Sequence, residues 1–265
     1  MNGSGQYVPF LESFDTILGN KPALEPSISF YQRLLARDQD EAADIAEDYL
    51  KIHSLEQTYD GLLIPALMYT QRNLENRNLT DDDQHYILGA AREVVKQIAA
   101  LPQAAPESAS QPGPDEDVAT VLQKVRILGC PARSETDEVA LLMLKELLDS
   151  KRYDITLMTN SSLVSDVVAL VEREKPALIR IAALPPGGIA HTRLLCLRLR
   201  ARFPGLKIVV GRWGLIEDLE RNQQQLLSAG ADDVGMTFQK TRNKIENLAH
   251  LASPREREAE LERAS

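Results

Sequence analysis

The residues best suited to bind a ligand lie in the loops that are predicted to follow five buried strands. Arginine side chains pair well with phosphates and carboxylates, and the glycines of Pro185–Gly188 let a backbone approach an anion at a helix N-terminus. The same segment is also typical of a tight turn from a strand to a helix. The candidate ligand-binding residues in these loops are Arg133, Asp137, Asn160, Ser161, Ser162, Gly187, Gly188, His191, Thr192, Arg212 and Trp213.

The sequence lacks the common catalytic and metal-binding motifs. It has no phosphate-binding loop of the form G-x-x-x-x-G-K-[ST], no G-x-G-x-x-G after the first predicted strand and no nucleophile elbow. The four histidines, at positions 53, 85, 191 and 250, are too scattered for local metal ligation, and Cys130 and Cys196 fit no metal-ligand spacing. We therefore expect a protein that is not an enzyme, with no metal site and with two reduced thiols in its core.

Five alternating strands and helices are predicted to position these loops. The strands are expected at 124–130, 154–158, 177–184, 206–211 and 231–236, and the helices at 135–149, 164–174, 189–203, 216–228 and 239–251. Short connections between such units predict a parallel sheet with helices on both faces. Five strands favour the flavodoxin-like order 2-1-3-4-5, in which ligands bind at the carboxyl ends of the strands.

The residues before this region have the periodicity of helices. Helices are expected at 29–36, 39–52, 54–73 and 80–100, which predicts a four-helix bundle over 27–100. Ser54 and Thr80 are typical helix N-caps, and Gln57 completes a capping-box pattern after Ser54. Pro65 lies inside the third helix and is expected to kink it.

A proline-rich segment separates the two regions. Residues 101–120 hold few large apolar side chains and are expected to form a linker between the bundle and the 121–252 domain, with a leading segment at 1–26 and a charged tail at 253–265. Residues 1–100 carry a net charge of −8 and residues 119–252 a net charge of +4. This difference favours two halves that attract each other, although it can also arise by chance on two solvated surfaces. The overall net charge of −9 argues against a nucleic-acid partner.

Arg180 interrupts the apolar run of the predicted central strand. A buried guanidinium is costly unless it is paired. We expect Arg180 either to reach water at an edge of the sheet or to face an acidic residue.

The order of bundle, linker and flavodoxin-like domain resembles the cobalamin-binding module. The segment Pro65–Leu74, with Gln84 and His85 after it, is similar to the bundle segment of light- and cobalamin-sensing regulators, in which Pro-Ala-Leu is followed by a Trp and then by Glu-His. Leu74 takes the Trp position, Gln84 the Glu position, and His85 is retained. The resemblance implies that these residues cap the upper face of a corrin. His85 is more simply explained as a half-exposed residue on the surface of a helix.

Some cobalamin domains bind the cofactor with its lower ligand displaced. Their main sequence motif is altered in this chain. Their Asp-x-His-x-x-Gly motif corresponds here to Glu135–Ala140, with Asp137 at the His position. A carboxylate is a poor substitute for an imidazole as a cobalt ligand. The Ser-x-Leu motif that borders the nucleotide tail in that family corresponds either to Ser161–Leu163 or to Ala182–Leu184.

A second resemblance covers nearly the whole chain. Tyr7–Leu24, Phe30–Asp38, Arg198–Pro204 and Val209–Gly214 look like segments of the extension that follows the last membrane helix in long members of the autoinducer-2 exporter (PerM-like) permease family. This resemblance implies a cytosolic domain at the inner face of the membrane, with the permease domain as its partner. No run of apolar residues in this chain approaches the ~20 residues of a membrane helix.

These observations favour a non-enzymatic regulatory or interaction domain of a permease-type protein, with a cobalamin-domain fold that lacks the cobalt-ligating His. The alternative is a genuine sensor that binds a small-molecule corrinoid, base-on cobalamin, between the bundle and the sheet. In that alternative Leu74 and His85 would cap the corrin, and Ser161, Ser162 and the Gly187–Gly188 turn would lie near its tail. A corrinoid-dependent enzyme is disfavoured because the expected His is absent, and an anionic ligand near Arg133 and Arg212 is a further possibility.

Overall fold

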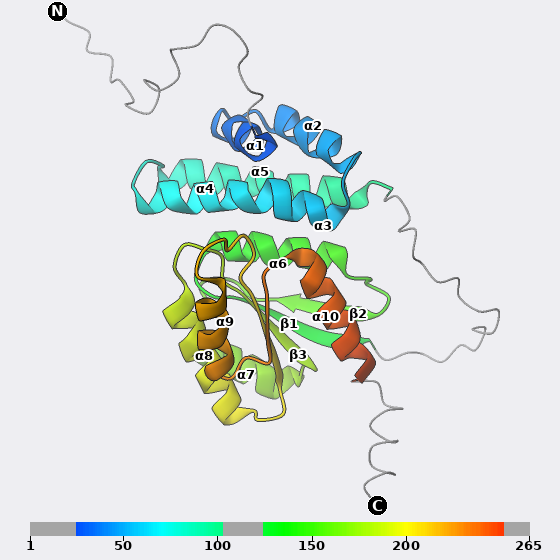
Figure 1. Ribbon diagram of the computed structural model, residues 1–265, viewed down its shortest axis with the longest axis vertical. Helices are drawn as coiled ribbons and strands as arrows, with labels where there is room; N and C mark the ends of the chain where they lie inside the picture. The colour runs from blue at the N-terminus through cyan, green and yellow to red at the C-terminus, as the bar shows by residue number, and fades with distance from the viewer. Residues whose placement is uncertain (1–24, 103–123, 252–265) are drawn as a thin grey trace, which may run out of the picture.

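The computed structural model describes residues 25–102 and 124–251, which form a helical bundle stacked on an α/β half (Figure 1). The predicted leading segment and charged tail, and most of the predicted linker, lie outside the described residues. The bundle comprises α1 (Pro26–Leu35), α2 (Gln39–Leu50), α3 (Leu55–Thr58), the π-helix η2 (Tyr59–Leu63), α4 (Ile64–Glu75) and α5 (Asp81–Ala100).

Local sequence signals account for the helix boundaries of the bundle. Ser54 and Thr80 both cap their helices, as predicted, and the predicted capping box of Ser54 is complete. Thr80 also forms a capping box, with Asp83, which was not predicted. The single helix predicted over 54–73 is instead α3, η2 and α4 in succession, and Pro65 lies in the first turn of α4. A proline is tolerated there because the first helical turn leaves its N–H groups unpaired within the helix. The helix therefore continues through one π-helical turn, Tyr59–Leu63, which ends two residues before Pro65.

The α/β half contains a five-stranded parallel sheet in the order β2-β1-β3-β4-β5, which confirms the predicted flavodoxin-like topology. Its elements are β1 (Val125–Pro131), α6 (Glu135–Leu147), β2 (Tyr153–Leu157), α7 (Val164–Glu174), β3 (Leu178–Ala182), α8 (Ile189–Arg202), β4 (Lys207–Gly211), α9 (Leu219–Ser228), β5 (Asp233–Gly235) and α10 (Phe238–Leu251). The middle strand β3 is buried along its whole length, which is why it is a nearly continuous apolar run. The edge strand β2 is only partly buried, and its residues alternate in exposure.

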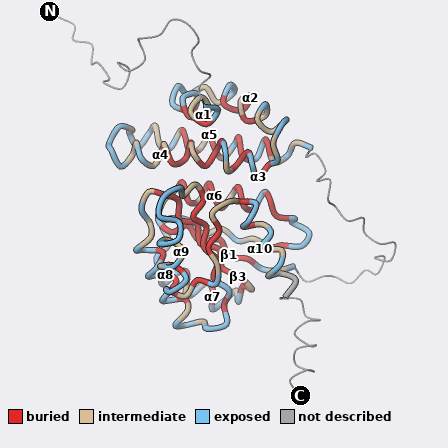
Figure 2. The backbone as a smooth tube through the Cα atoms, in the orientation of Figure 1, coloured by how far each residue is buried: buried red, intermediate tan, exposed pale blue. Residues whose placement is uncertain are grey.

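The two faces of the sheet belong to different cores. Residues of α7, α8 and α9, such as Val167, Leu195 and Leu226, pack on one face with a core of their own. On the other face, α6 and α10 pack in a core that continues into the bundle, and α6 lies between the bundle and the sheet (Figure 1). Figure 2 shows buried residues on the facing sides of these helices and through the strands. The bundle is therefore docked on the α/β half by shared hydrophobic packing.

Candidate functional site

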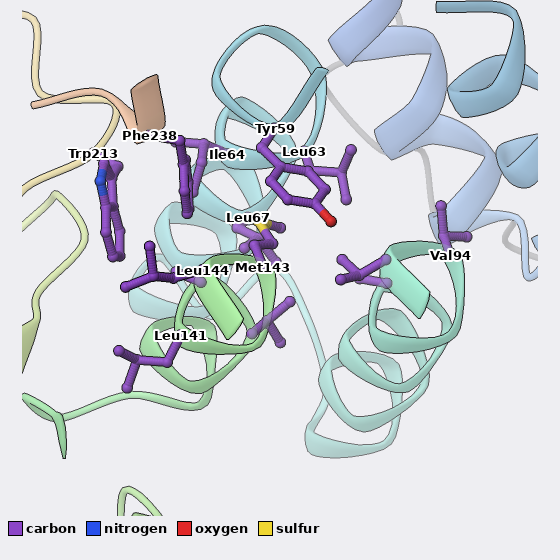
Figure 3. Close-up of a cluster of buried hydrophobic side chains, with 14 of the residues drawn as sticks. Tyr59, Leu63, Ile64, Leu67, Val94, Leu141, Met143, Leu144, Trp213 and Phe238 are labelled. Carbon is purple, nitrogen blue, oxygen red and sulfur yellow. The ribbon is translucent and has the colours of Figure 1, made fainter. Parts of the chain in front are cut away.

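The carboxyl ends of β4 and β5 meet the bundle directly. Phe238, at the start of α10, contacts Tyr59 edge-on with ring centroids 5.5 Å apart, and it stacks on Trp213 at 4.4 Å (Figure 3). Gly214 lies against α4 so closely that a Cβ atom there would overlap Sδ of Met68 and come within 2.6 Å of Cγ2 of Ile64. Side chains of the protein itself therefore fill the space between the bundle and this part of the sheet edge.

Polar contacts hold the rim of the same junction. Oγ1 of the buried Thr136 donates to Oε1 of Gln71 at 3.3 Å, which ties the N-terminus of α6 to α4. Arg92 of α5 pairs with Glu138 at 3.2 Å. At the other end, Nη1 of Arg242 in α10 donates to Oε1 of Glu56 in α3 at 2.6 Å. The junction is thus closed by contacts that extend across both α6 and α10.

Asp60 joins the π-helix to α10. Its two carboxylate oxygens accept the backbone N–H of Phe238 at 3.0 and 2.9 Å, so that Asp60 caps the N-terminus of α10 from the bundle. Burial raises the pKa of Asp60 to about 6, although the hydrogen bonds from the α10 backbone oppose this rise. An isolated aspartate has a pKa of about 3.9.

We expect this carboxyl to make stability pH-dependent. Because its pKa is higher in the folded protein, its contribution is fully present below pH ~4 and is lost as the pH rises through 6. Asp60→Asn keeps an oxygen that can accept from Phe238 but does not titrate. Urea unfolding from pH 4 to 7 should therefore show a smaller loss of stability in this variant than in the wild type, and equal losses would contradict the assignment.

Asp137, at the position of the cobalt-ligating His, is a structural residue. It is 2% exposed, and its Oδ1 accepts the N–H of Leu184 at 2.7 Å while Oδ2 accepts the N–H groups of Arg133 and Ser134 at 3.0 Å each. Burial raises the pKa of Asp137, and the three N–H groups counteract that rise. Both oxygens are thus occupied by the loops after β1 and β3. The contact with Leu184 places the Ala182–Leu184 segment beside this position.

Asp137→Asn is expected to lower the free energy of unfolding by about 1–3 kcal/mol, because an amide nitrogen cannot accept a hydrogen bond from a buried N–H group. Asp166→Asn is a matched control, since Asp166 also accepts a backbone N–H, from Leu163, but is exposed. Urea denaturation of both variants measures the difference. Equal, small losses would show that the contacts of Asp137 contribute little.

Arg212 stabilises the loop that was predicted to bind an anion. The Arg212 side chain is 3% exposed, and its Nη1 donates to the carbonyl oxygens of Ala183 at 2.7 Å and Gly187 at 2.8 Å. Gly187 and Gly188 have φ angles of +83° and +73°, values that favour glycine. The guanidinium therefore holds a tight strand-to-helix turn, which is the second of the two interpretations that the sequence allowed.

Trp213 and Arg180 are both fully buried on the face of the sheet that bears α10. Nε1 of Trp213 donates to Oγ1 of Thr241 at 3.0 Å, and Nη2 of Arg180 donates to the same oxygen at 2.9 Å. The guanidinium carbon of Arg180 lies 4.9 Å from the centroid of the Trp213 ring. The prediction that Arg180 reaches water is wrong, because the side chain is enclosed on the middle strand. Its contacts are to a hydroxyl and a ring, and the acid Asp233 acts on it through its charge rather than through a hydrogen bond.

The residues expected to cap a corrin lie where α4 ends and α5 begins. Leu74 and Gln84 are half-buried. The side chain of His85 is exposed and makes no hydrogen bond or ion pair within the described residues. Their role in binding stays a prediction. Ser161 and Ser162 lie with Thr159 in a cluster of hydroxyl groups after β2, and His191 is exposed on the first turn of α8. Thus the structure gathers Arg133, Asp137, Gly187, Gly188 and Arg212, whereas Trp213 belongs to the core.

Sequence reasoning missed Asp60, Phe238 and Thr241, which build the junction. Each has an unremarkable local context: an acid within a helix, the first residue of a helix, and a helical threonine. Thr241 lies one helical turn after Thr237, and its complete burial could not be read from that spacing. The size of the two aromatic side chains, Trp213 and Phe238, was the one available signal, because large aromatic residues bury much surface and dominate cores and interfaces alike.

Within the described residues, no group of three or more His, Cys, Asp or Glu side chains is arranged to hold a metal ion. Cys130 and Cys196 are buried free thiols, as predicted, and burial raises the pKa of both to about 12. None of the helices over residues 25–102 and 124–251 has the length and apolar character needed to cross a membrane.

Solved structures with similar folds include cobalamin proteins, and also signal receiver and response regulator proteins that cover about half of this chain. The monomethylamine corrinoid protein of Methanosarcina barkeri has a TM-score of 0.52 at 12% identity, covering 86% of this chain and 97% of that chain. A cobalamin-binding protein from Desulfitobacterium hafniense (0.39, 10% identity, 83% and 97% covered) and the methanol:cobalamin methyltransferase complex of M. barkeri (0.40, 11% identity, 92% and 90% covered) are less similar by TM-score. No protein-family model and no curated protein sequence matches the chain. The first comparison establishes a fold of the cobalamin-binding type.

The residues at the junction do not fit a corrin there. If a corrin lay between the bundle and the strand ends, as the sequence resemblance implies, it would have to displace Phe238 and separate Gly214 from α4. Asp137 supplies no nitrogen ligand, and both of its oxygens already accept backbone N–H groups. At the carboxyl ends of the strands, these residues therefore form a closed structural contact between the sheet and the bundle.

Proposed function

We propose that this chain is a non-enzymatic regulatory or interaction domain with a cobalamin-binding-type fold that does not use cobalamin. The observation that carries the proposal is the packing of Trp213 and Phe238 against Tyr59 and α4, which fills the space between bundle and sheet. Because the bundle is packed against the sheet in this way, the domain presents a fixed surface rather than an open cleft. It suits a role in contact with another protein.

The position of Asp137 supports the same proposal. A carboxylate that caps two loops through three backbone N–H groups has a structural reason to be there, and that reason is independent of any metal. Substituting a histidine would restore a ligand type but remove this cap. At the position of the cobalt-ligating His, this domain therefore has a residue whose hydrogen bonds stabilise its own loops.

We further propose that the partner is a membrane permease domain and that the chain acts in the cytosol at the inner face of the membrane. The support for this is the sequence resemblance of Tyr7–Leu24, Phe30–Asp38 and Val209–Gly214 to permease extensions. A test is cross-linking of this chain to the detergent-solubilised membrane domain of such a permease. Specific cross-links would support the proposal, and their absence, when the extension native to that permease does cross-link, would count against it.

Titration with cobalamin tests the central part of the proposal. Purified protein is mixed in the dark with hydroxocobalamin, methylcobalamin and adenosylcobalamin, and binding is followed by the visible spectrum and by calorimetry. We expect no binding at micromolar concentrations. Stoichiometric binding with a base-on spectrum would overturn the proposal in favour of the corrinoid sensor, and His85→Ala would then show whether His85 caps the corrin as the resemblance implies.

A further inference from the structure

The fully buried guanidinium of Arg180 has more hydrogen-bond donors than its surroundings accept. Of its nitrogens, Nη2 donates to Oγ1 of Thr241 at 2.9 Å, while Nε and Nη1 have no hydrogen-bond partner among the described residues. A guanidinium carries five N–H donors and no acceptor. Buried polar groups in folded proteins nearly always have partners, so unpartnered donors at this depth call for an acceptor.

Thr241 adds a further donor to this group. Its oxygen accepts from both Nη2 of Arg180 and Nε1 of Trp213, which uses both lone pairs of the hydroxyl. The hydroxyl proton of Thr241 is consequently left to donate. The three side chains form a buried group with several free donors around one shared acceptor, an arrangement complementary to a negative charge.

No carboxylate bonds to Arg180 to balance its charge. Asp233 acts on Arg180 only through space, and the Asp233 carboxylate lies 3.6 Å from Nζ of Lys244. Burial lowers the pKa of Arg180 to about 9, so the guanidinium remains positive at neutral pH. The face of the Trp213 ring offers a partial counter-charge at 4.9 Å, but it satisfies none of the free N–H groups. An uncompensated buried cation is strongly destabilising.

The neighbours of the guanidinium limit the size of a ligand. Gly129 is the residue in register with Arg180 on β1. A Cβ on Gly235 of β5 would lie 2.3 Å from Oγ1 of Thr241 and 3.1 Å from Nη2 of Arg180, so no ligand fits between Gly235 and this pair. Arg180, Trp213 and Thr241 are all 0% exposed. We propose that Arg180 and Thr241 bind a small inorganic anion of about the size of chloride in the core, between the sheet and α10.

Trp213 is the only tryptophan of the chain and therefore reports directly on this site. The protein is titrated with chloride against gluconate, which is too large to enter, at constant ionic strength. We expect saturable changes in Trp213 fluorescence and in the melting temperature. Chloride at ten times its dissociation constant should reduce the unfolding equilibrium constant by about 11-fold. No difference between chloride and gluconate would overturn the proposal.

The variant Arg180→Met tests whether Arg180 binds the anion. Methionine fills a similar length without a charge, so the variant is expected to fold and to lose the dependence on chloride. Thr241→Val, which removes the hydroxyl, should weaken the dependence and provides a second test if Arg180→Met does not fold. The control is Arg200→Met, because Arg200 is fully bonded to Gly230, Pro204, Leu206 and Asp232; it should retain the dependence. An unchanged chloride dependence in Arg180→Met would place the anion elsewhere and overturn the proposal.

Discussion

Replacing Trp213 with alanine should lower the free energy of unfolding by about 3–5 kcal/mol, the typical cost of removing a large aromatic side chain from a core. The indole is completely buried, stacks on Phe238 at 4.4 Å and donates to Thr241 at 3.0 Å, so that the alanine leaves a cavity and an unfilled acceptor. Because the variant has no tryptophan, urea unfolding is followed by circular dichroism. A loss below about 1 kcal/mol would contradict the assignment of Trp213 to the core.

Two comparisons separate the shape of the Trp213 side chain from its hydrogen bond. Trp213→Phe retains an aromatic ring over Phe238 but loses the bond to Thr241, and we expect a smaller loss of stability than for alanine. An apolar cavity can bind a matching apolar guest. Free indole should therefore raise the melting temperature of Trp213→Ala and leave that of the wild type unchanged. An equal effect of indole on both proteins would show that it binds outside the cavity.

Gly214→Ala should cost about 2–4 kcal/mol, from overpacking and backbone strain together. The added Cβ would overlap Sδ of Met68 and lie 2.6 Å from Cγ2 of Ile64, a side chain whose β-branching limits its movement. The φ angle of +76° at Gly214 adds strain for any residue with a Cβ. Urea unfolding gives the loss, and hydrogen exchange at the Phe238 amide is expected to rise as the bundle is pushed from the sheet.

Gly187→Ala is the matched control for this substitution. Gly187 has a similar φ angle, +83°, but a Cβ there would meet nothing within 4 Å. Its cost should be limited to backbone strain, about 1–2 kcal/mol. The difference between the two variants therefore measures the contact between Gly214 and α4. If the two substitutions cost the same, the junction is not tightly packed at that point.

The fold could be predicted because its signals are local. The apolar run around Ile179 and Ile181 is that of a strand buried on both faces, and five strands that alternate with helices favour the flavodoxin-like order that is observed. Ser54 and Thr80 cap helices within four residues of themselves, which sequence shows directly. The predicted ends of helices and strands were less accurate. For example, the helix expected from residue 216 begins at Leu219.

The closed junction could not be predicted because its contacts join distant parts of the chain. Trp213 in a strand-end loop gives the same local pattern whether it touches a ligand or fills a core, and only its contacts with Phe238 and Thr241 decide between the two. Asp137 was recognised as replacing a cobalt ligand, but its cap on Leu184 depends on the loop after β3. Arg180 was singled out correctly as unusual, but its contacts with Thr241 and Trp213 could not be predicted, because these residues lie far from it in the sequence.

Acrylamide quenching of the single tryptophan tests the closed junction most directly. The fluorescence of Trp213 is measured with increasing acrylamide, first for the protein alone and then with excess hydroxocobalamin. A buried indole beneath the bundle should show blue-shifted emission and weak quenching by acrylamide, with the same quenching constant in both series after correction for absorption by the corrinoid. Strong quenching of the protein alone, or a quenching constant that changes with hydroxocobalamin, would show that the space between the bundle and the sheet opens.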